Sequence, residues 1–371
     1  MLVGVPKEIK VHEYRVGLTP ASVGELTRRG HQVLVETDAG RGIGALDAQY
    51  VEAGAAIAAD AAEVFGKADM VVKVKEPLAP ERKLLRPGQI LFTYLHLAAD
   101  KVLTREMLES GAVGIAYETV TAAGGGLPLL APMSEVAGRM SIQAAAHSLE
   151  KSQGGMGVLL GGVVGTEPAK VLVLGGGIVG SNAVAMAMGM GADVTVVDQS
   201  VAVLRNLSAR FGPALKTAVS MRQTVSALLR QADVVVIGVL VPGAAAPRLV
   251  TAEDVKAMKP GSVIVDVAID QGGGAETSRP TTHSEPTYIV DEVVHYCVAN
   301  MPGAVARTST YALNNATLPF VLQLADMGAM DAMRRNGHLA AGLNIFKGKL
   351  TEANVARDLD LPFAPREALI A

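Results

Sequence analysis

The sequence predicts an α/β protein with two doubly wound domains, each built on a mostly parallel sheet. Short, unbroken apolar runs such as residues 171–174 are typical of parallel strands that are buried on both faces. These runs alternate with helical patterns along the chain, as expected for parallel sheets with helical crossovers. The chain has 371 residues, whereas single cores stop growing at roughly 250–300 residues. We therefore expect two domains.

The first third of the chain predicts a complete doubly wound sheet. A helix is expected at residues 19–29, because Pro20 suits a first helical position and Gly30 suits the position just past the end. The glycine-rich stretch 40–44 opens no convincing helix and is interpreted as a loop. Strands are expected at residues 2–5, 32–36, 70–74, 90–94 and 113–117.

A glycine fingerprint, G-x-G-x-x-G, follows the predicted strand at residues 170–174. In this motif Gly175 makes a tight turn, Gly177 lets the backbone approach a pyrophosphate, and Gly180 lets the next helix pack closely on the strand. The start of that helix would direct N–H groups at the phosphates. The motif alone is also compatible with an ordinary glycine-rich loop. Its strand–turn–helix–strand context favours a Rossmann-like dinucleotide site.

The residue that ends the next strand indicates which dinucleotide is bound. Asp198 follows Gly175 by 23 residues, close to the roughly 20-residue offset of the carboxylate that holds the ribose hydroxyls. A carboxylate at this position repels a 2′-phosphate, which favours NAD over NADP. Arg205 is near in the sequence, so the preference is not exclusive.

A Gly/Ala/Pro-rich stretch at residues 121–132 indicates a linker to the second domain. Ser134 then suits the N-cap of a long helix that ends at residues 154–155. Because the start of that helix would face the ligand edge, Ser134 is either a cap only or also a contact for cofactor phosphate. Beyond the fingerprint, helices are expected at residues 201–210, 222–231 and 252–258, and strands at residues 234–240 and 262–270.

The last part of the chain predicts helices at residues 319–333 and 337–346, which we expect to return to the first domain. The predicted organisation is two doubly wound Rossmann-like domains with the active site in the cleft between them. A discontinuous substrate domain at residues 1–128 and 307–371 would flank a NAD-binding domain at residues 129–306.

Four polar residues lie near the carboxyl ends of predicted strands, where the ligands of doubly wound sheets bind. Arg15, Lys75 and His96 follow three strands of the first domain, and together they can hold a small carboxylate and move a proton. Taken singly, Arg15 and Lys75 are also compatible with solvated loop charges, and His96 with a strand cap. Asp270 ends a predicted strand of the second domain before a glycine loop, where it is either a functional carboxylate or a turn former.

The composition argues against several classes of protein. A net charge of −3, a pI near 6.2, 4% aromatic residues and no Trp give no footprint for nucleic-acid binding. Apolar runs stay far below the ~20 residues that span a bilayer, and the strand-like start leaves no room for a signal peptide, so we expect a cytoplasmic protein without a membrane partner. Cys297 is the only cysteine, which excludes an internal disulfide and a thiolate metal cluster, and no metal site is predicted. The mean hydropathy of +0.32 indicates subunits that bury surface against each other.

Several position-specific stretches resemble the alanine dehydrogenase family over essentially the whole chain. The family also includes the soluble nucleotide-binding part of proton-pumping nicotinamide nucleotide transhydrogenases. The stretches are Gly-Val-Pro-Lys-Glu-Ile-Lys at 4–10 with Arg15-Val16, Lys-Val-Lys-Glu-Pro at 73–77, Tyr-Leu-His-Leu-Ala at 94–98, the fingerprint at 175–180, Asp-Val-Ala-Ile-Asp-Gln-Gly-Gly at 266–273 and His-Tyr-Cys-Val-Ala-Asn-Met-Pro-Gly at 295–303.

The resemblance implies the reversible oxidative deamination of L-alanine to pyruvate and ammonium with NAD, carried out by a homohexamer. Arg15 and Lys75 would bind the carboxylate and oxygen of the substrate, and His96 and Asp270 would be the acid/base residues. Cofactor contacts would come from Ser134, Gly175, Gly177, Ile178, Val179, Gly180, Asp198, Ser220, Val239, Leu240, Val267, Ala268, Ile269, Asp270, Arg279, Val298, Ala299, Asn300 and Met301.

Two positions depart from the family pattern. Val203 stands where the family commonly has a basic residue near the adenosine, so that contact is lost or passes to Arg205. Ala306 stands in a loop where the family often has proline. Neither position touches the chemistry.

Two other functions are compatible with the nucleotide-binding motifs. One is a non-catalytic nucleotide-binding subunit that needs a membrane partner, as in transhydrogenase, and the other is a NAD-sensing module. Neither would turn over an amino acid. The joint presence of Lys75, His96 and Asp270 argues against the first.

Overall fold

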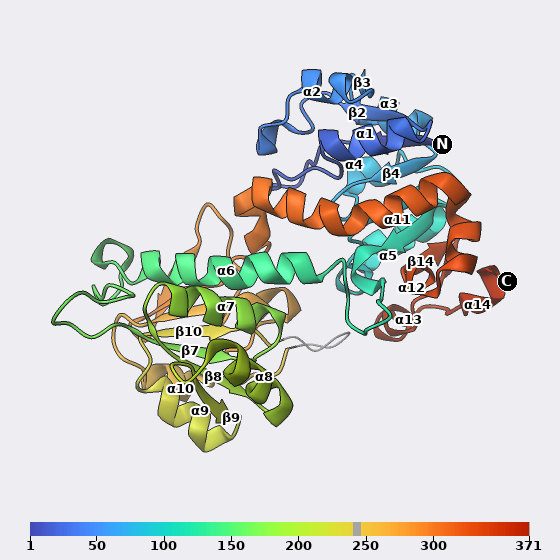
Figure 1. Ribbon diagram of the computed structural model, residues 1–371. Helices are drawn as coiled ribbons and strands as arrows, with labels where there is room; N and C mark the ends of the chain where they lie inside the picture. The colour runs from blue at the N-terminus through green and yellow to red at the C-terminus, as the bar shows by residue number, and fades with distance from the viewer. Residues whose placement is uncertain (240–245, 371) are drawn as a thin grey trace. The chain divides into compact units, whose positions relative to one another are not determined.

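The computed structural model describes residues 1–239 and 246–370, which fold into two compact units. Unit 1 contains Met1–Met133 and Gly303–Ala371, and unit 2 contains Ser134–Pro302. Each unit is built on its own mostly parallel sheet (Figure 1). The predicted α/β class with two doubly wound sheets is confirmed.

The sheet of unit 1 has the strand order β15-β14-β6-β5-β4-β1-β2-β3. β1 to β6 run parallel, and the direction of winding reverses between the neighbouring strands β1 and β4. β14 and β15 extend the sheet antiparallel beyond β6. The strands are β1 (Leu2–Val5), β2 (Gln32–Glu36), β3 (Ala56–Ala58), β4 (Met70–Val72), β5 (Ile90–Thr93), β6 (Val113–Ala116), β14 (Leu343–Phe346) and β15 (Lys349–Leu350).

The central strands of unit 1 are buried on both faces. Met70, Val71 and Val72 of β4 are all 0% exposed, as the unbroken apolar run predicts. Helix α11 lies beside α1 (Figure 1). The helices of unit 1 are α1 (Pro20–Arg28), α2 (Asp47–Glu52), α3 (Ala61–Lys67), α4 (Ala79–Arg82), α5 (Lys101–Glu109), α11 (Ala306–Arg335), α12 (Gly337–Ala340), α13 (Ala353–Leu359) and α14 (Glu367–Ile370).

The sheet of unit 2 has the strand order β12-β13-β11-β10-β7-β8-β9, with β12 antiparallel at one edge. Its winding reverses between β7 and β10. The strands are β7 (Lys170–Leu174), β8 (Asp193–Asp198), β9 (Lys216–Val219), β10 (Val234–Ile237), β11 (Val263–Asp266), β12 (Thr287–Val290) and β13 (Val293–Tyr296).

Alternate side chains of β7 enter two separate cores. Val171 and Val173 pack with residues of α6, α7 and α8, whereas Leu172 and Leu174 pack with residues of α9 and α10 on the other face. This arrangement explains why the strand has no polar alternation. The helices of unit 2 are α6 (Ala131–Ser148), which begins within unit 1, α7 (Ile178–Gly189), α8 (Val201–Phe211), α9 (Arg222–Leu229) and α10 (Ala252–Lys256).

The prediction for the C-terminal segment is wrong in two respects. α11 begins at Ala306 rather than near Pro319, and it contains a kink at Gly328 with φ of 74°. The predicted helix at residues 337–346 is instead the short α12 followed by β14. Leu343 and Ile345 are 0% exposed because β14 pairs with β6, and this pairing outweighs local helical preference.

Candidate functional site

Three predicted site residues of unit 1 follow neighbouring parallel strands. Arg15 lies in the loop after β1, Lys75 follows β4, and His96 follows β5. The register pairs Gly4 with Val71 and Val72 with Phe92, so these strands end at the same edge of the sheet. β1 and β4 flank the switch point, where doubly wound sheets bind ligands.

Arg15 is buried and is held by Glu13. The guanidinium, 2% exposed, donates from Nε to Glu13 Oε1 at 2.6 Å and from Nη2 to Glu13 Oε2 at 2.5 Å. Its Nη1 lies 3.0 Å from the sulfur of Met133. Burial acts to lower the pKa of Arg15, but the hydrogen bonds and charge of Glu13 outweigh it and raise that pKa. The guanidinium is therefore a permanent, oriented cation.

The backbone at Lys75 is fixed from both sides. Its N–H donates to Glu8 Oε1 at 3.3 Å, and its carbonyl accepts from Thr93 Oγ1 at 2.9 Å. The loops after β1 and β4 are also joined by an ion pair between Lys10 and Glu76. These contacts place Lys75 at the strand edge independently of any substrate.

His96 has a left-handed backbone that a carboxylate stabilises. Its φ is 48°, and its N–H donates to Glu118 Oε1 at 2.6 Å. The imidazole is 42% exposed, lies stacked on the Tyr94 ring at 5.6 Å between centroids, and has Nδ1 3.9 Å from Glu118 Oε1. The ring is thus exposed and has an acidic neighbour.

The glycines of the fingerprint in unit 2 are needed for different reasons: some for the backbone conformation or the packing, and one for the approach of a ligand. Gly175 has φ of 94°, which favours glycine, and a Cβ at Gly180 would lie 1.7 Å from the carbonyl oxygen of Gly175. Gly177 has φ of −68°, and apart from its chain neighbours no described atom lies within 4 Å of the place where its Cβ would stand. The fold itself therefore does not demand glycine at 177, whereas a pyrophosphate approaching the backbone does.

Asp198 ends β8 and joins this turn. Its Oδ2 accepts from the N–H of Gly176 at 2.7 Å and its Oδ1 accepts from the N–H of Ser200 at 2.8 Å. Val203 packs against the same turn, since a Cβ on Gly176 would lie 2.7 Å from Val203 Cγ1. Val203, at the position where the family commonly has a basic residue, therefore makes an apolar contact with this turn. The N–H of Ser220 donates to the Asp198 carbonyl at 3.0 Å, which brings the end of β9 to the same edge.

The structure corrects the prediction for Ser134. This residue lies within α6, three residues after the first, Ala131, and is therefore not the N-cap; the helix ends at Ser148 rather than at residues 154–155. Gly138 lies one turn further along the same face, and a Cβ there would lie 2.2 Å from the carbonyl oxygen of Val179. α6 therefore packs closely on the first turn of α7, with Ser134 on the packed face.

Asp270 lies beyond its strand rather than at its end. β11 stops at Asp266, and a 3-10 turn over Val267–Gln271 carries the exposed Asp270. Asp266 is 0% exposed and closes the loop by accepting from Gly274 N at 2.8 Å and Ser278 Oγ at 2.6 Å. Burial raises the pKa of Asp266, although these hydrogen bonds oppose the rise.

Most of the remaining expected cofactor residues lie in segments that follow strands of unit 2, and Arg279 lies in the segment before β12. Val239 follows β10, and its side chain lies beside Gly175. A Cβ on Gly175 would lie 3.1 Å from Val239 Cγ2. The guanidinium of Arg279 lies 4.1 Å from the centroid of the Tyr288 ring. Asn300, in the segment after β13, has φ of 66°. Leu240 lies outside the described residues. Ile178 and Val179 begin α7, Ala268 and Ile269 lie in the 3-10 turn, and Val298, Ala299 and Met301 flank Asn300.

Sequence reasoning missed four carboxylates that organise these loops: Glu8, Glu13, Glu118 and Asp266. Glu118 had a signal, because it directly follows a predicted strand. Glu8 and Glu13 lie in the same stretch as Arg15, but an acidic residue in a loop normally suggests a solvated surface.

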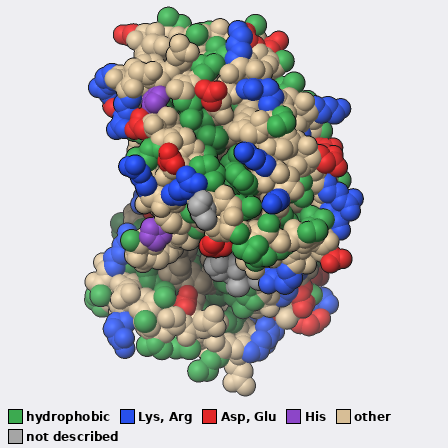
Figure 2. Space-filling model, turned by 90° about the vertical axis from the view of Figure 1, so that its right-hand side faces the viewer, with side chains coloured by type: hydrophobic (Ala, Val, Ile, Leu, Met, Phe, Trp, Pro, Cys, Tyr) green, Lys and Arg blue, Asp and Glu red, His purple; other side chains and the backbone are tan. Residues whose placement is uncertain are grey.

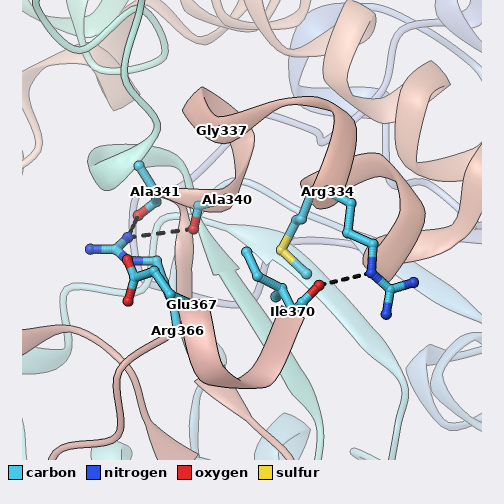
Figure 3. A pocket seen from close by; sticks show the side chains of 8 residues that line it. Arg334, Gly337, Ala340, Ala341, Arg366, Glu367 and Ile370 are labelled. Carbon is cyan, nitrogen blue, oxygen red and sulfur yellow. Dashed lines mark hydrogen bonds and ion pairs between the residues drawn. The ribbon is translucent and has the colours of Figure 1, made fainter.

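A separate open pocket lies in unit 1 between α12 and the C-terminal helix. Arg334 donates to the Ile370 carbonyl at 2.8 Å and Arg366 to the Ala341 carbonyl at 2.6 Å, which holds α14 in place (Figure 3). The pocket includes none of the predicted site residues. It is lined by Met333, Arg334, Gly337, Ala340, Ala341, Arg366, Glu367 and Ile370.

Positive and negative side chains are interspersed over the face drawn in Figure 2. Among residues 1–239 and 246–370, no helix is both long and apolar enough to cross a membrane. Within the same described ranges, no three His, Cys, Asp or Glu side chains are grouped so as to hold a metal ion.

Comparison with known proteins matches both halves of the chain to one family. The model "Alanine dehydrogenase/PNT, N-terminal domain" matches residues 4–137. The model "Alanine dehydrogenase/PNT, C-terminal domain" matches residues 141–353.

Full-length relatives agree with these matches. The chain is 58% identical to an alanine dehydrogenase of Halomonas elongata, with 100% of each chain covered. A solved L-alanine dehydrogenase is 50% identical, with a TM-score of 0.94 over 97% of this chain and 99% of the other. A solved transhydrogenase from Sinorhizobium meliloti is 26% identical, with a TM-score of 0.82 over 95% of this chain and 99% of the other. The chain belongs to the alanine dehydrogenase/PNT family.

Proposed function

We propose that this chain is an NAD-dependent L-alanine dehydrogenase, which oxidises L-alanine reversibly to pyruvate and ammonium. The observation that carries the proposal is the alignment of Arg15, Lys75 and His96 after three neighbouring strands of unit 1. Two cations and an imidazole at one edge can bind a small carboxylate and move a proton. Identity of 58% to a named alanine dehydrogenase, against 26% to the transhydrogenase chain, favours this function over a nucleotide-binding transhydrogenase subunit.

NAD fits the residues of unit 2. The open space at Gly177 admits a pyrophosphate, and Asp198 stands at the end of β8, where a ribose hydroxyl is held. When bound, NAD accepts the hydride that leaves Cα of alanine. The residues proposed to hold NAD are Ser134, Gly175, Gly177, Ile178, Val179, Gly180, Asp198, Ser220, Val239, Leu240, Val267, Ala268, Ile269, Asp270, Arg279, Val298, Ala299, Asn300 and Met301.

The residues of unit 1 perform the substrate chemistry in this proposal. Arg15 and Lys75 bind the carboxylate and the developing oxygen of the substrate, and Lys75 stabilises negative charge on that oxygen. His96 takes the proton that the ammonium must lose before hydride departure, because histidine is the side chain that most often serves as a positioned general base. Asp270 orients the water that adds to the resulting iminium. Collapse of the carbinolamine then returns a proton to the departing amine and yields pyruvate.

A spectrophotometric assay tests the proposal. The purified protein is mixed with NAD or NADP and with L-alanine, glycine, L-serine or no amino acid, and nucleotide reduction is followed. We expect reduction of NAD with L-alanine and far slower reduction of NADP. A protein that binds NADH but reduces NAD with none of these amino acids would contradict the proposed activity.

We also propose that the protein works in the cytoplasm as a homohexamer. The mean hydropathy of +0.32 supports burial of surface between subunits, and the resemblance to the family supports six subunits. Light scattering coupled to size exclusion tests the subunit number. A monomer at micromolar concentration would contradict the hexamer, and recovery of the protein in a membrane fraction would contradict the location.

A further inference from the structure

A buried group of three charged side chains lies between the loops that follow β1 and β4. Lys73 is 1% exposed, and its Nζ lies 3.0 Å from Glu8 Oε2 and 3.0 Å from Glu81 Oε1. Glu8 comes from the loop after β1, Lys73 directly follows β4, and Glu81 lies in α4. Burial raises the pKa of Glu8, and Lys73 opposes that rise. Two carboxylates therefore share one ammonium out of contact with water.

A gain in folding stability does not readily explain why this group of buried charges is present. Replacing a buried charge cluster by apolar side chains of similar volume is often neutral or stabilising, because desolvation offsets the Coulomb attraction. An apolar residue at position 8, however, has no oxygen to accept hydrogen bonds. A glutamate at position 8, unlike an apolar residue, therefore supplies two acceptor oxygens at a defined place.

Glu8 uses its second oxygen on the backbone that carries Lys75. Oε1 accepts from the N–H of Val74 at 2.6 Å and from the N–H of Lys75 at 3.3 Å. Glu81 makes a different backbone contact, since its Oε2 accepts from the N–H of Leu78 at 2.8 Å. Glu8 and Glu81 thus share Lys73, but only Glu8 contacts the backbone at residue 75.

We propose that Glu8 is a positioning residue for the substrate, which fixes the backbone of Lys75 while Lys73 holds the Glu8 carboxylate in place. The inference rests on the proposed function, in which Lys75 binds the substrate oxygen. In this arrangement the substrate carboxylate and oxygen meet two cations, Arg15 and Lys75, that are set by acidic residues of the same loop, Glu13 and Glu8.

The matched variants Glu8→Gln and Glu81→Gln test the idea kinetically. Each places an amide beside Lys73, but only Glu8→Gln weakens the acceptor for the N–H of Lys75. We expect Glu8→Gln to raise the KM for pyruvate about tenfold or more and to leave the KM for NADH within about twofold, because a small misplacement of a binding group is costly. Glu81→Gln should leave the KM for pyruvate within about threefold. Equal effects of the two variants on pyruvate would overturn the proposal.

A double-mutant cycle asks whether Glu8 acts through Lys75. In a Lys75→Ala background, Glu8→Gln should add less than about threefold to the loss of kcat/KM, because the group that it positions is already gone. If Glu8→Gln lowers kcat/KM by the same factor in the Lys75→Ala background as in the unaltered chain, Glu8 acts elsewhere and the proposal fails.

Hydrogen exchange at the amides of Val74 and Lys75 separates this inference from the proposed function, since it requires no turnover. Both amides should exchange at least about tenfold faster in Glu8→Gln than in the unaltered chain, and at the unaltered rate in Glu81→Gln. Unchanged exchange in Glu8→Gln would overturn the positioning role. Failure of the unaltered protein to oxidise alanine, together with faster exchange in Glu8→Gln, would instead refute only the activity.

Discussion

The carboxylate of Glu118 holds His96 in a left-handed backbone conformation. Glu118 Oε1 accepts from the N–H of His96 at 2.6 Å and from the N–H of Leu95 at 3.1 Å, and His96 has φ of 48°. A residue with a Cβ reaches this region at a cost of about 1–2 kcal/mol. The hydrogen bonds to Glu118 help to offset that cost, and they direct the imidazole out of the core to an exposed place above Tyr94.

Replacing Glu118 should therefore impair catalysis without impairing nucleotide binding. We expect Glu118→Ala to lower kcat about 10- to 100-fold, because the backbone at His96 relaxes and the imidazole is misplaced. Glu118→Gln retains an acceptor oxygen and should lose less. Steady-state kinetics and NADH titration by fluorescence measure both effects. Loss of NADH affinity in step with kcat would show a general disruption instead.

Removal of the imidazole itself tests the assignment of proton transfer. His96→Ala should lower turnover by about 10²–10⁴-fold, the usual contribution of a general acid or base. NADH affinity should stay nearly unchanged. His147→Ala is a matched control, because that side chain is 63% exposed on α6 and belongs to no proposed site. Full activity of His96→Ala would refute the assigned role.

Gly177→Ala separates a requirement of the ligand from a requirement of the fold. Apart from its chain neighbours, no described atom lies within 4 Å of the added Cβ, so the melting temperature should fall only by the small amount that alanine costs at an N-cap. The affinity for NADH should drop at least about tenfold, because the methyl group occupies the path of the pyrophosphate. Gly189→Ala, at the other end of α7, meets nothing within 4 Å outside its own helix backbone, so it should leave the affinity for NADH unchanged and should not lower the melting temperature. Unchanged NADH affinity in Gly177→Ala would place the pyrophosphate elsewhere.

Asp254 should contribute a pH-dependent part of the stability of unit 2. Its side chain is 7% exposed, and burial by itself would raise its pKa. Hydrogen bonds from Thr251, Ser226 and Arg222 outweigh burial and lower the pKa to about 2, below the ordinary value of 3.8. The ionised carboxylate therefore stabilises the fold when the pH is above the ordinary pKa. This contribution is lost as the pH falls toward the pKa of Asp254 in the folded protein.

Urea unfolding measures that contribution. Asp254→Asn should lower the free energy of unfolding by about 1–2 kcal/mol at neutral pH. The difference from the unaltered chain should stay constant down to about pH 5 and shrink below about pH 4. Glu253→Gln is the control, because that neighbouring side chain is 81% exposed. A difference that grows on acidification would contradict the assigned direction of the pKa shift.

The elements that sequence reasoning located well are those whose signal is local. The strand at residues 171–174 is apolar at every position, and β7 lies there because both of its faces are buried. α1 begins at Pro20, with Thr19 as its N-cap, and Gly30 follows the helix with φ of 82°. In each case the residues that carry the signal are also the residues that form the element.

The misplaced elements depend on distant partners. The segment Leu343–Phe346 is a strand because it pairs with β6, more than two hundred residues earlier. The unpredicted first part of α11 contains Asn314, which contacts the loop before α1 by accepting from Thr19 N at 3.0 Å and donating to the Gly17 carbonyl at 3.1 Å. A local pattern contains neither partner.

The sequence by itself determined the α/β class, the glycine turn and the strands that Arg15, Lys75 and His96 follow, because apolar runs and glycine spacing are local properties of the chain. Only the tertiary structure decided which carboxylates set these residues in place. Glu8 contacts the N–H of Lys75 across 67 residues and Glu118 that of His96 across 22. Such contacts arise when parallel strands bring their carboxyl ends together. The low-dielectric surroundings that strengthen these hydrogen bonds exist only after folding.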